Sequence, residues 1–140
     1  MTEAPGFQLF EHEPFFYEVI FANFKRSTLD AWLADVDMRY PAMKEAPRIL
    51  TLYDLRAMMS FTPYAVHAFW GVIKREYKAT DSRIAFLVRQ NLINVRLRYA
   101  VARYRGRNGA GQVFFDRDEA FAWLRAGLSE PLPVPTQLRG

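Results

Sequence analysis

Polar side chains gather where the apolar segments of this sequence end, and they are the residues best placed to bind a ligand. The candidate ligand-binding residues are Asn23, Arg26, Asp54, Arg56, Ser60, Thr62, Arg89 and Asn91. If the apolar segments are parallel strands, their carboxyl ends meet at the sheet edge where open α/β proteins bind ligands. Helix amino termini at that edge favour an anion, and Arg56 and Arg89 would attract one too. The sequence predicts an anion-binding crevice there.

The same residues have a structural alternative. Thr62 and Asn91 are of the types that cap helices, and Asp54 can pair with Arg56 or with Arg89. Every α/β sheet needs polar residues at this edge. The crevice is then a solvated edge whose polar groups bind one another.

The inventory for catalysis is small. The two histidines are His12, expected in a hairpin turn, and His67, expected on a helix with no histidine or carboxylate three or four residues away. That spacing gives no metal site, and no serine has the pattern of a nucleophile elbow. We therefore expect a protein that is not an enzyme, with no catalytic residues, metal or cofactor.

An arginine-rich stretch, residues 83–107, raises the alternative of nucleic-acid binding. Its arginines are Arg83, Arg89, Arg96, Arg98, Arg103, Arg105 and Arg107, with no acidic residue among them. Guanidinium groups bind phosphate, and Tyr99 or Tyr104 could stack a base. On a helix, however, these arginines flank both sides of an apolar face, which suits side chains that extend over a core. Nucleic-acid binding is therefore the second alternative only.

The elements that must position these residues follow from hydrophobic periodicity. Strands are predicted at 7–11, 15–23, 48–54, 83–88 and 112–115. Helices are predicted from a Ser27–Asp30 capping box to Pro41, from Thr62 to about Lys78, beyond Asn91, and after Asp116 with Glu119. Glycines 106, 109 and 111 are expected to form a turn. The order β-β-α-β-α-β-α-β-α predicts an α/β fold whose five-stranded sheet is mixed but mostly parallel, with four helices.

Apolar residues on one of these helices predict self-association. Leu92, Val95 and Tyr99 lie on the side of the helix beyond Asn91 that faces away from its expected core face. An exposed apolar patch of this kind is typical of a surface that binds another protein. We expect a homodimer formed through these three residues.

Length and composition set the class of protein. With 140 residues, 51% of them hydrophobic, the chain has material for one core, and we expect a single domain over residues 1–140 with a core at about 7–126 and a proline-rich tail at 127–140. The net charge is +4 and there is no cysteine. The amino terminus has no basic region before an apolar stretch, and no segment is long enough to span a bilayer. These features predict a cytoplasmic protein.

The run RILTLYDLR at residues 48–56, the ending QVFFDRDEAFAWL at 112–124 and the order of elements resemble one family. It is the STAS family of anti-sigma-factor antagonists and their bacterial relatives. In its signalling members a serine at the start of the second helix is phosphorylated. Here that turn reads AMMSFTP, where Ser60 and Thr62 are the hydroxyl groups, without the aspartate and glycine of the family motif.

The resemblance implies a non-catalytic interaction or regulatory module with a protein partner of unknown identity. The alternative is a carrier or sensor of a small apolar or anionic ligand, because similar domains are related in fold to lipid-binding SEC14-like proteins. Met58 and Met59, beside the crevice, could then line an apolar pocket.

Overall fold

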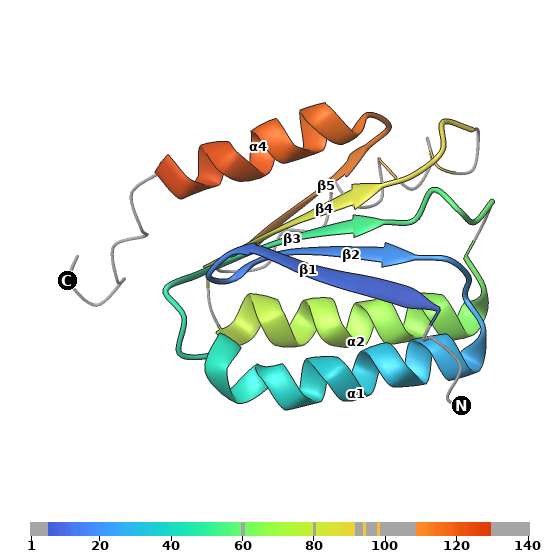
Figure 1. Cartoon of the computed structure of the whole chain (residues 1–140), viewed down its shortest axis with the longest axis horizontal. Coiled ribbons are helices and arrows are strands. Elements are labelled where there is room, and N and C mark those ends of the chain that lie inside the picture. The colour runs from blue at the N-terminus through green and yellow to red at the C-terminus, as the bar shows by residue number, and fades with distance from the viewer. Residues whose placement is uncertain are drawn as a thin grey trace.

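A five-stranded sheet forms the middle layer of the protein, as Figure 1 shows. A computed structural model describes residues 6–59, 61–79, 81–91, 94, 98 and 109–129. The strands are β1 (Phe7–Glu13), β2 (Phe16–Phe21), β3 (Arg48–Asp54), β4 (Asp81–Leu87) and β5 (Gly109–Phe114), and they lie side by side in chain order. Only the first pair is antiparallel, and the other pairs are parallel. The expected mixed, mostly parallel sheet is confirmed.

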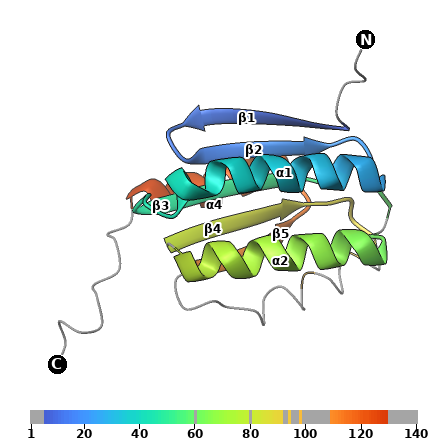
Figure 2. The same ribbon diagram turned by 90° about the horizontal axis from the view of Figure 1, so that it is seen from below.

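Two helices cover one face of the sheet and one covers the other. Helices α1 (Arg26–Met43) and α2 (Pro63–Ala79) lie side by side on the first face (Figures 1 and 2). The steps β2-α1-β3 and β3-α2-β4 run in the same direction along the sheet, and crossovers of one hand then place both helices on one face. The last helix, α4 (Arg117–Ser129), follows the edge strand and packs on the opposite face (Figure 1).

Each face has its own core. On the α1–α2 face, Trp32 and Phe69 pack with ring centroids 4.6 Å apart, and Phe21 and Tyr53 of the sheet contact both rings. The core on the α4 face contains Phe16, Leu50, Leu52, Ala85, Leu87, Phe114, Ala120, Phe121 and Leu124. Because strand side chains alternate between faces, this assignment fixes which way every neighbouring strand residue points.

Helix α1 departs from its predicted ends. Ser27 makes no side-chain cap, and the helix begins one residue earlier, at Arg26. The N-cap residue is Lys25, and no side chain caps the helix. Asn23 Oδ1 instead holds the chain before α1, accepting hydrogen bonds from the Lys25 N–H (3.0 Å) and the Thr28 hydroxyl (2.6 Å). The expected end at Pro41 is also wrong, because the helix runs on to Met43. Proline in the final turn removes one backbone hydrogen bond and leaves little helix beyond it to disrupt.

Two further expectations need correction. Gly109 and Gly111 lie in strand β5 rather than in a turn, paired in parallel with β4. Three helices lie within the described residues rather than four. The fourth, expected beyond Asn91, falls outside them except for Asn94 and Arg98, as does Gly106. Among the described helices, none has the length and apolar character needed to cross a bilayer.

Candidate functional site

Two buried carboxylates lie on the α4 face of the sheet, Glu18 in the middle of β2 and Asp54 at the carboxyl end of β3. Leu52 belongs to the core under α4, Glu18 is its register partner on β2, and Asp54 is two residues further along β3. Strand alternation therefore places both carboxylates on this face. Glu18 is 2% exposed and Asp54 is 6% exposed. Charged side chains are almost never buried so deeply unless they are paired.

Glu18 is held by a histidine and an arginine from two other elements. The distance from His12 Nε2 to Glu18 Oε1 is 2.8 Å, and Arg117 Nη2 lies 3.1 Å from both carboxylate oxygens. Arg117 Nε donates to Oε2 at 3.2 Å. His12 comes from β1 and Arg117 begins α4. This cluster ties the β1–β2 hairpin to the helix that covers the sheet.

Asp54 is held by its own neighbour in the chain. Arg56 donates to the two oxygens of Asp54 from Nε (3.0 Å) and Nη2 (2.9 Å), and its backbone N–H donates as well. The hydrogen bond to Asp54 raises the pKa of the Arg56 guanidinium. Arg89 donates from Nε to the Arg56 carbonyl, and its Nη1 lies 3.1 Å from Met59 Sδ.

Thr62 and Asn91 cap helical turns. The Thr62 hydroxyl oxygen accepts the Ala65 N–H at 3.1 Å, and Asn91 Oδ1 accepts the Asn94 N–H at 2.8 Å. The Asn94 amide also donates to the Arg89 carbonyl at 2.7 Å. These are the contacts of the structural alternative, as is the Asp54–Arg56 pair. Anion binding at this crevice stays a prediction.

The remaining crevice residues lie with the helices of the other face. Asn23 precedes α1, and the Arg26 guanidinium lies over the Tyr64 ring, 4.7 Å from its centroid. The Tyr64 hydroxyl donates to Asp30, and this hydrogen bond raises the pKa of Tyr64. The structure thus brings Asp54, Arg56 and Arg89 together and places Asn23 and Arg26 with α1 and α2. Ser60, Leu92, Val95 and Tyr99 lie outside the described residues, so the predictions for them stand untested.

Sequence reasoning missed the cluster of His12, Glu18 and Arg117. It placed His12 in a turn, but β1 extends to Glu13 with an irregular register beside His12, and Phe15 takes the positive φ of 64° in the turn. The available signal was Glu18 itself, the one charged residue in the run FFYEVIF at residues 15–21. A charge in a buried strand requires a partner from elsewhere in the chain.

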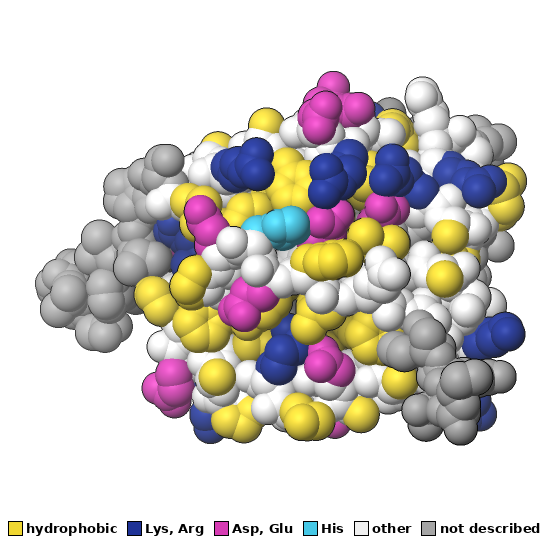
Figure 3. Space-filling model, viewed as in Figure 1, with side chains coloured by type: hydrophobic (Ala, Val, Ile, Leu, Met, Phe, Trp, Pro, Cys, Tyr) yellow, Lys and Arg dark blue, Asp and Glu magenta, His cyan; other side chains and the backbone are white. Residues whose placement is uncertain are grey.

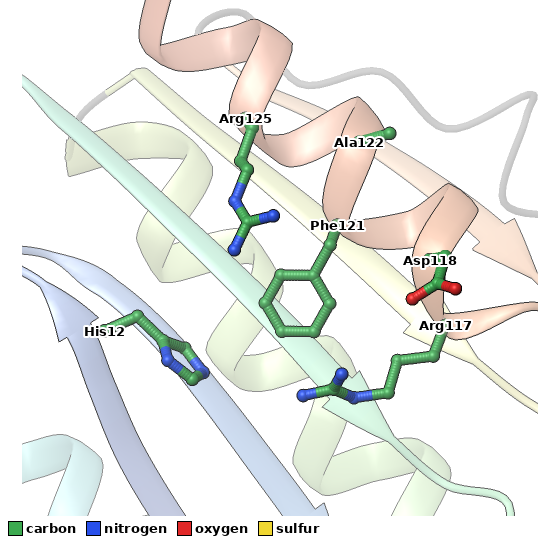
Figure 4. Close-up of a pocket in the computed structure, with 6 residues that line it drawn as sticks. All are labelled: His12, Arg117, Asp118, Phe121, Ala122 and Arg125. Atoms are coloured by element: carbon green, nitrogen blue, oxygen red, sulfur yellow. The ribbon is translucent and has the colours of Figure 1, made fainter.

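An open groove lies between α4 and the β1–β2 hairpin. It has a volume of about 310 Å³ and is lined by His12, Arg117, Asp118, Phe121, Ala122 and Arg125. In Figure 4 the guanidinium groups of Arg117 and Arg125 extend from α4 on either side of the Phe121 ring, and His12 faces them from the β1–β2 hairpin. Figure 3 shows a line of basic side chains on this face of the molecule, with acidic side chains and a histidine beneath it. Among the described residues, no group of three or more His, Asp or Glu side chains could hold a metal ion.

A solved structure with the same arrangement of elements supports the fold assignment. It is the crystal structure of an uncharacterized protein of the DUF3478 family, with a SpoIIAA-like fold, from Shewanella loihica PV-4. The two structures superpose with a TM-score of 0.62 over 89% of this chain and 98% of the other, at 16% sequence identity. The chain has a SpoIIAA-like fold.

The SpoIIAA-like fold confirms the STAS-like architecture that the residue runs at 48–56 and 112–124 predicted. At this sequence identity the likeness concerns the fold alone. No protein-family model and no curated protein matches the sequence. The function of this SpoIIAA-like chain has to be argued from its own side chains.

Proposed function

We propose that the chain is a non-catalytic module that binds a protein partner at the sheet edge where β3 leads into α2. The observation that carries the proposal is an exposed apolar side chain on this connection. Met59 is 61% exposed, and Val66 in the first turn of α2 is 38% exposed. Met58 and Phe61 between β3 and α2 are half-buried. Methionine suits such a surface because its flexible thioether adapts to different partners.

The chemistry of the neighbouring groups suggests the kind of partner. Arg89 uses Nε on the Arg56 carbonyl and Nη1 on the Met59 sulfur, and these contacts hold its exposed guanidinium at the rim of this surface. An apolar centre with an arginine at its rim is a common composition for a protein interface. A partner with an apolar anchor flanked by a carboxylate fits this surface.

The polar groups at the same edge support a binding role over a catalytic one. Asp54 accepts three hydrogen bonds from Arg56, and the Thr62 hydroxyl oxygen accepts the Ala65 N–H. A general base needs a carboxylate that can approach a substrate proton, and a nucleophilic hydroxyl needs an adjacent base. The contacts of Asp54 and Thr62 instead stabilise the end of β3 and the start of α2.

Photo-crosslinking tests this proposal. p-Benzoylphenylalanine is placed at position 59 or, as a control, at position 38 of the full-length chain expressed in its native cells. Met38 is 83% exposed on α1, on another part of the surface. We expect a discrete protein adduct at position 59 and none at position 38. The same adducts at both positions, or none at either, would contradict a docking surface at Met59.

A further inference from the structure

The groove between α4 and the β1–β2 hairpin contains a guanidinium group that is held in place without a carboxylate partner. Arg125 lies over the Phe121 ring at 5.3 Å from the ring centroid, and it forms no ion pair with any carboxylate of the described residues. Phe121 is itself packed against Phe16 and is 5% exposed. A cation held over a fixed ring loses less conformational freedom when it binds a ligand.

The second cation of the groove is already neutralised. Arg117 lies over the same ring at 4.4 Å, but its donors bind the buried Glu18. The remaining charges that line the groove are Arg125 and Asp118, with His12 opposite them. Glu18 neutralises Arg117 by direct contact, whereas Asp118 lines the groove without an ion pair to Arg125. Arg125 therefore favours a ligand with one negative charge, and the nearby Asp118 opposes a second one.

His12 provides a further contact for such a ligand. Its Nε2 is engaged by the Glu18 carboxylate, which orients the ring, and among the described residues no partner bonds Nδ1. The ring edge also packs against Phe121, with centroids 5.5 Å apart. In Figure 4 the His12 ring lies across from Arg125, and the Phe121 ring lies beside both. The exposed Ala122 methyl group, which also lines the groove, offers an apolar contact.

We propose that this groove binds a small organic carboxylate, with the carboxylate group on Arg125 and the apolar body of the ligand against Ala122, the Phe121 edge and the His12 ring. The volume of about 310 Å³ lies at the lower end of the range for small-molecule sites. The inference goes beyond the proposed function. The groove uses none of the residues around Met59, so either proposal can fail while the other holds.

Titration of the isotope-labelled protein with benzoate, followed by NMR, tests the site. We expect saturable shifts of the His12 ring signals and the Arg125 Nε–H signal, with the two histidines assigned through His67→Gln. Arg125→Gln should weaken benzoate binding about tenfold or more, as expected when a charge-assisted hydrogen bond is lost. Lys74→Gln removes one exposed positive charge from α2 and should leave the affinity unchanged. Asp118→Asn should tighten binding because it removes a like charge.

Other outcomes would overturn the proposal. These are the absence of saturable shifts up to the solubility limit of benzoate, or equal binding by the wild type and Arg125→Gln. Benzyl alcohol, which lacks the negative charge, should bind more weakly than benzoate. Equal affinity would show that Arg125 does not contribute to binding through its charge. Tighter binding of inorganic phosphate would contradict the carboxylate class. Loss of binding in Arg56→Gln but not in Arg125→Gln would place the anion at the carboxyl edge of the sheet instead.

Discussion

Arg117, the first residue of α4, binds the buried carboxylate of Glu18 on β2, 99 residues earlier in the chain. The helix lies over β3, β4 and β5, and its Phe121 ring also packs against Phe16 of β2 and His12 of β1. This ion pair is therefore the polar link between α4 and the antiparallel hairpin at the other side of the sheet. His12 completes it from β1.

Loss of this link should destabilise the protein. Arg117→Ala leaves Glu18 buried with only His12 as a partner, and we expect the free energy of unfolding to fall by about 1–3 kcal/mol. Arg125→Ala is the matched control, because it also removes a guanidinium from the Phe121 ring but leaves Glu18 paired. Urea denaturation compares the two variants. Equal losses would show that stacking on Phe121 explains the effect and that the ion pair contributes nothing.

A double-mutant cycle should show whether Asp54 and Arg56 stabilise each other. The variants are Asp54→Ala, Arg56→Ala and the double variant, each measured by chemical denaturation. Contacting pairs show coupling energies of about 0.5–3 kcal/mol, and we expect a value in this range for the bidentate pair. A coupling energy near zero would contradict a structural pair and favour the crevice hypothesis, in which both side chains serve a ligand.

The start of α1 offers a direct comparison between the cap predicted at Ser27 and the observed hydrogen bonds of Asn23. Asn23→Ala removes the acceptor for the Lys25 N–H and the Thr28 hydroxyl, and we expect a loss of about 1 kcal/mol. Ser27→Ala should change stability by less than about 0.5 kcal/mol, because Ser27 makes no side-chain cap. Thermal unfolding of both variants measures this difference. A larger loss of stability for Ser27→Ala than for Asn23→Ala would support the predicted capping box instead.

Self-association through Leu92, Val95 and Tyr99 stays a prediction from the sequence. Light scattering of the wild type should give the mass of a dimer, and Val95→Asp should give a monomer with an unchanged circular dichroism spectrum, because a buried charge opposes an apolar interface. A monomeric wild type at high concentration would contradict the prediction.

Local patterns in the sequence predicted most helices and strands. Contacts between residues far apart in the chain could not be predicted from such patterns. The β3 strand and the start of α2 were predicted correctly because the apolar run 48–54 and the Thr62–Pro63 cap are signals within a few residues. The Asp54–Arg56 pair was anticipated for the same reason. The Glu18–Arg117 pair could not be, since it depends on which strand α4 crosses. His12 was misplaced because the irregular register of β1 extends the strand past the expected turn.

A protein partner that docks at the edge marked by Met59 should depend on that side chain for its affinity. The most direct measurement is the affinity of the partner captured at position 59, determined by isothermal titration calorimetry with the wild type, Met59→Asp, Met38→Asp and Arg125→Gln. We expect binding to be about tenfold or more weaker for Met59→Asp, as for a central interface residue, and to keep the wild-type affinity for the other two variants. Wild-type affinity in Met59→Asp, or an equal loss in Met38→Asp, would contradict docking at Met59.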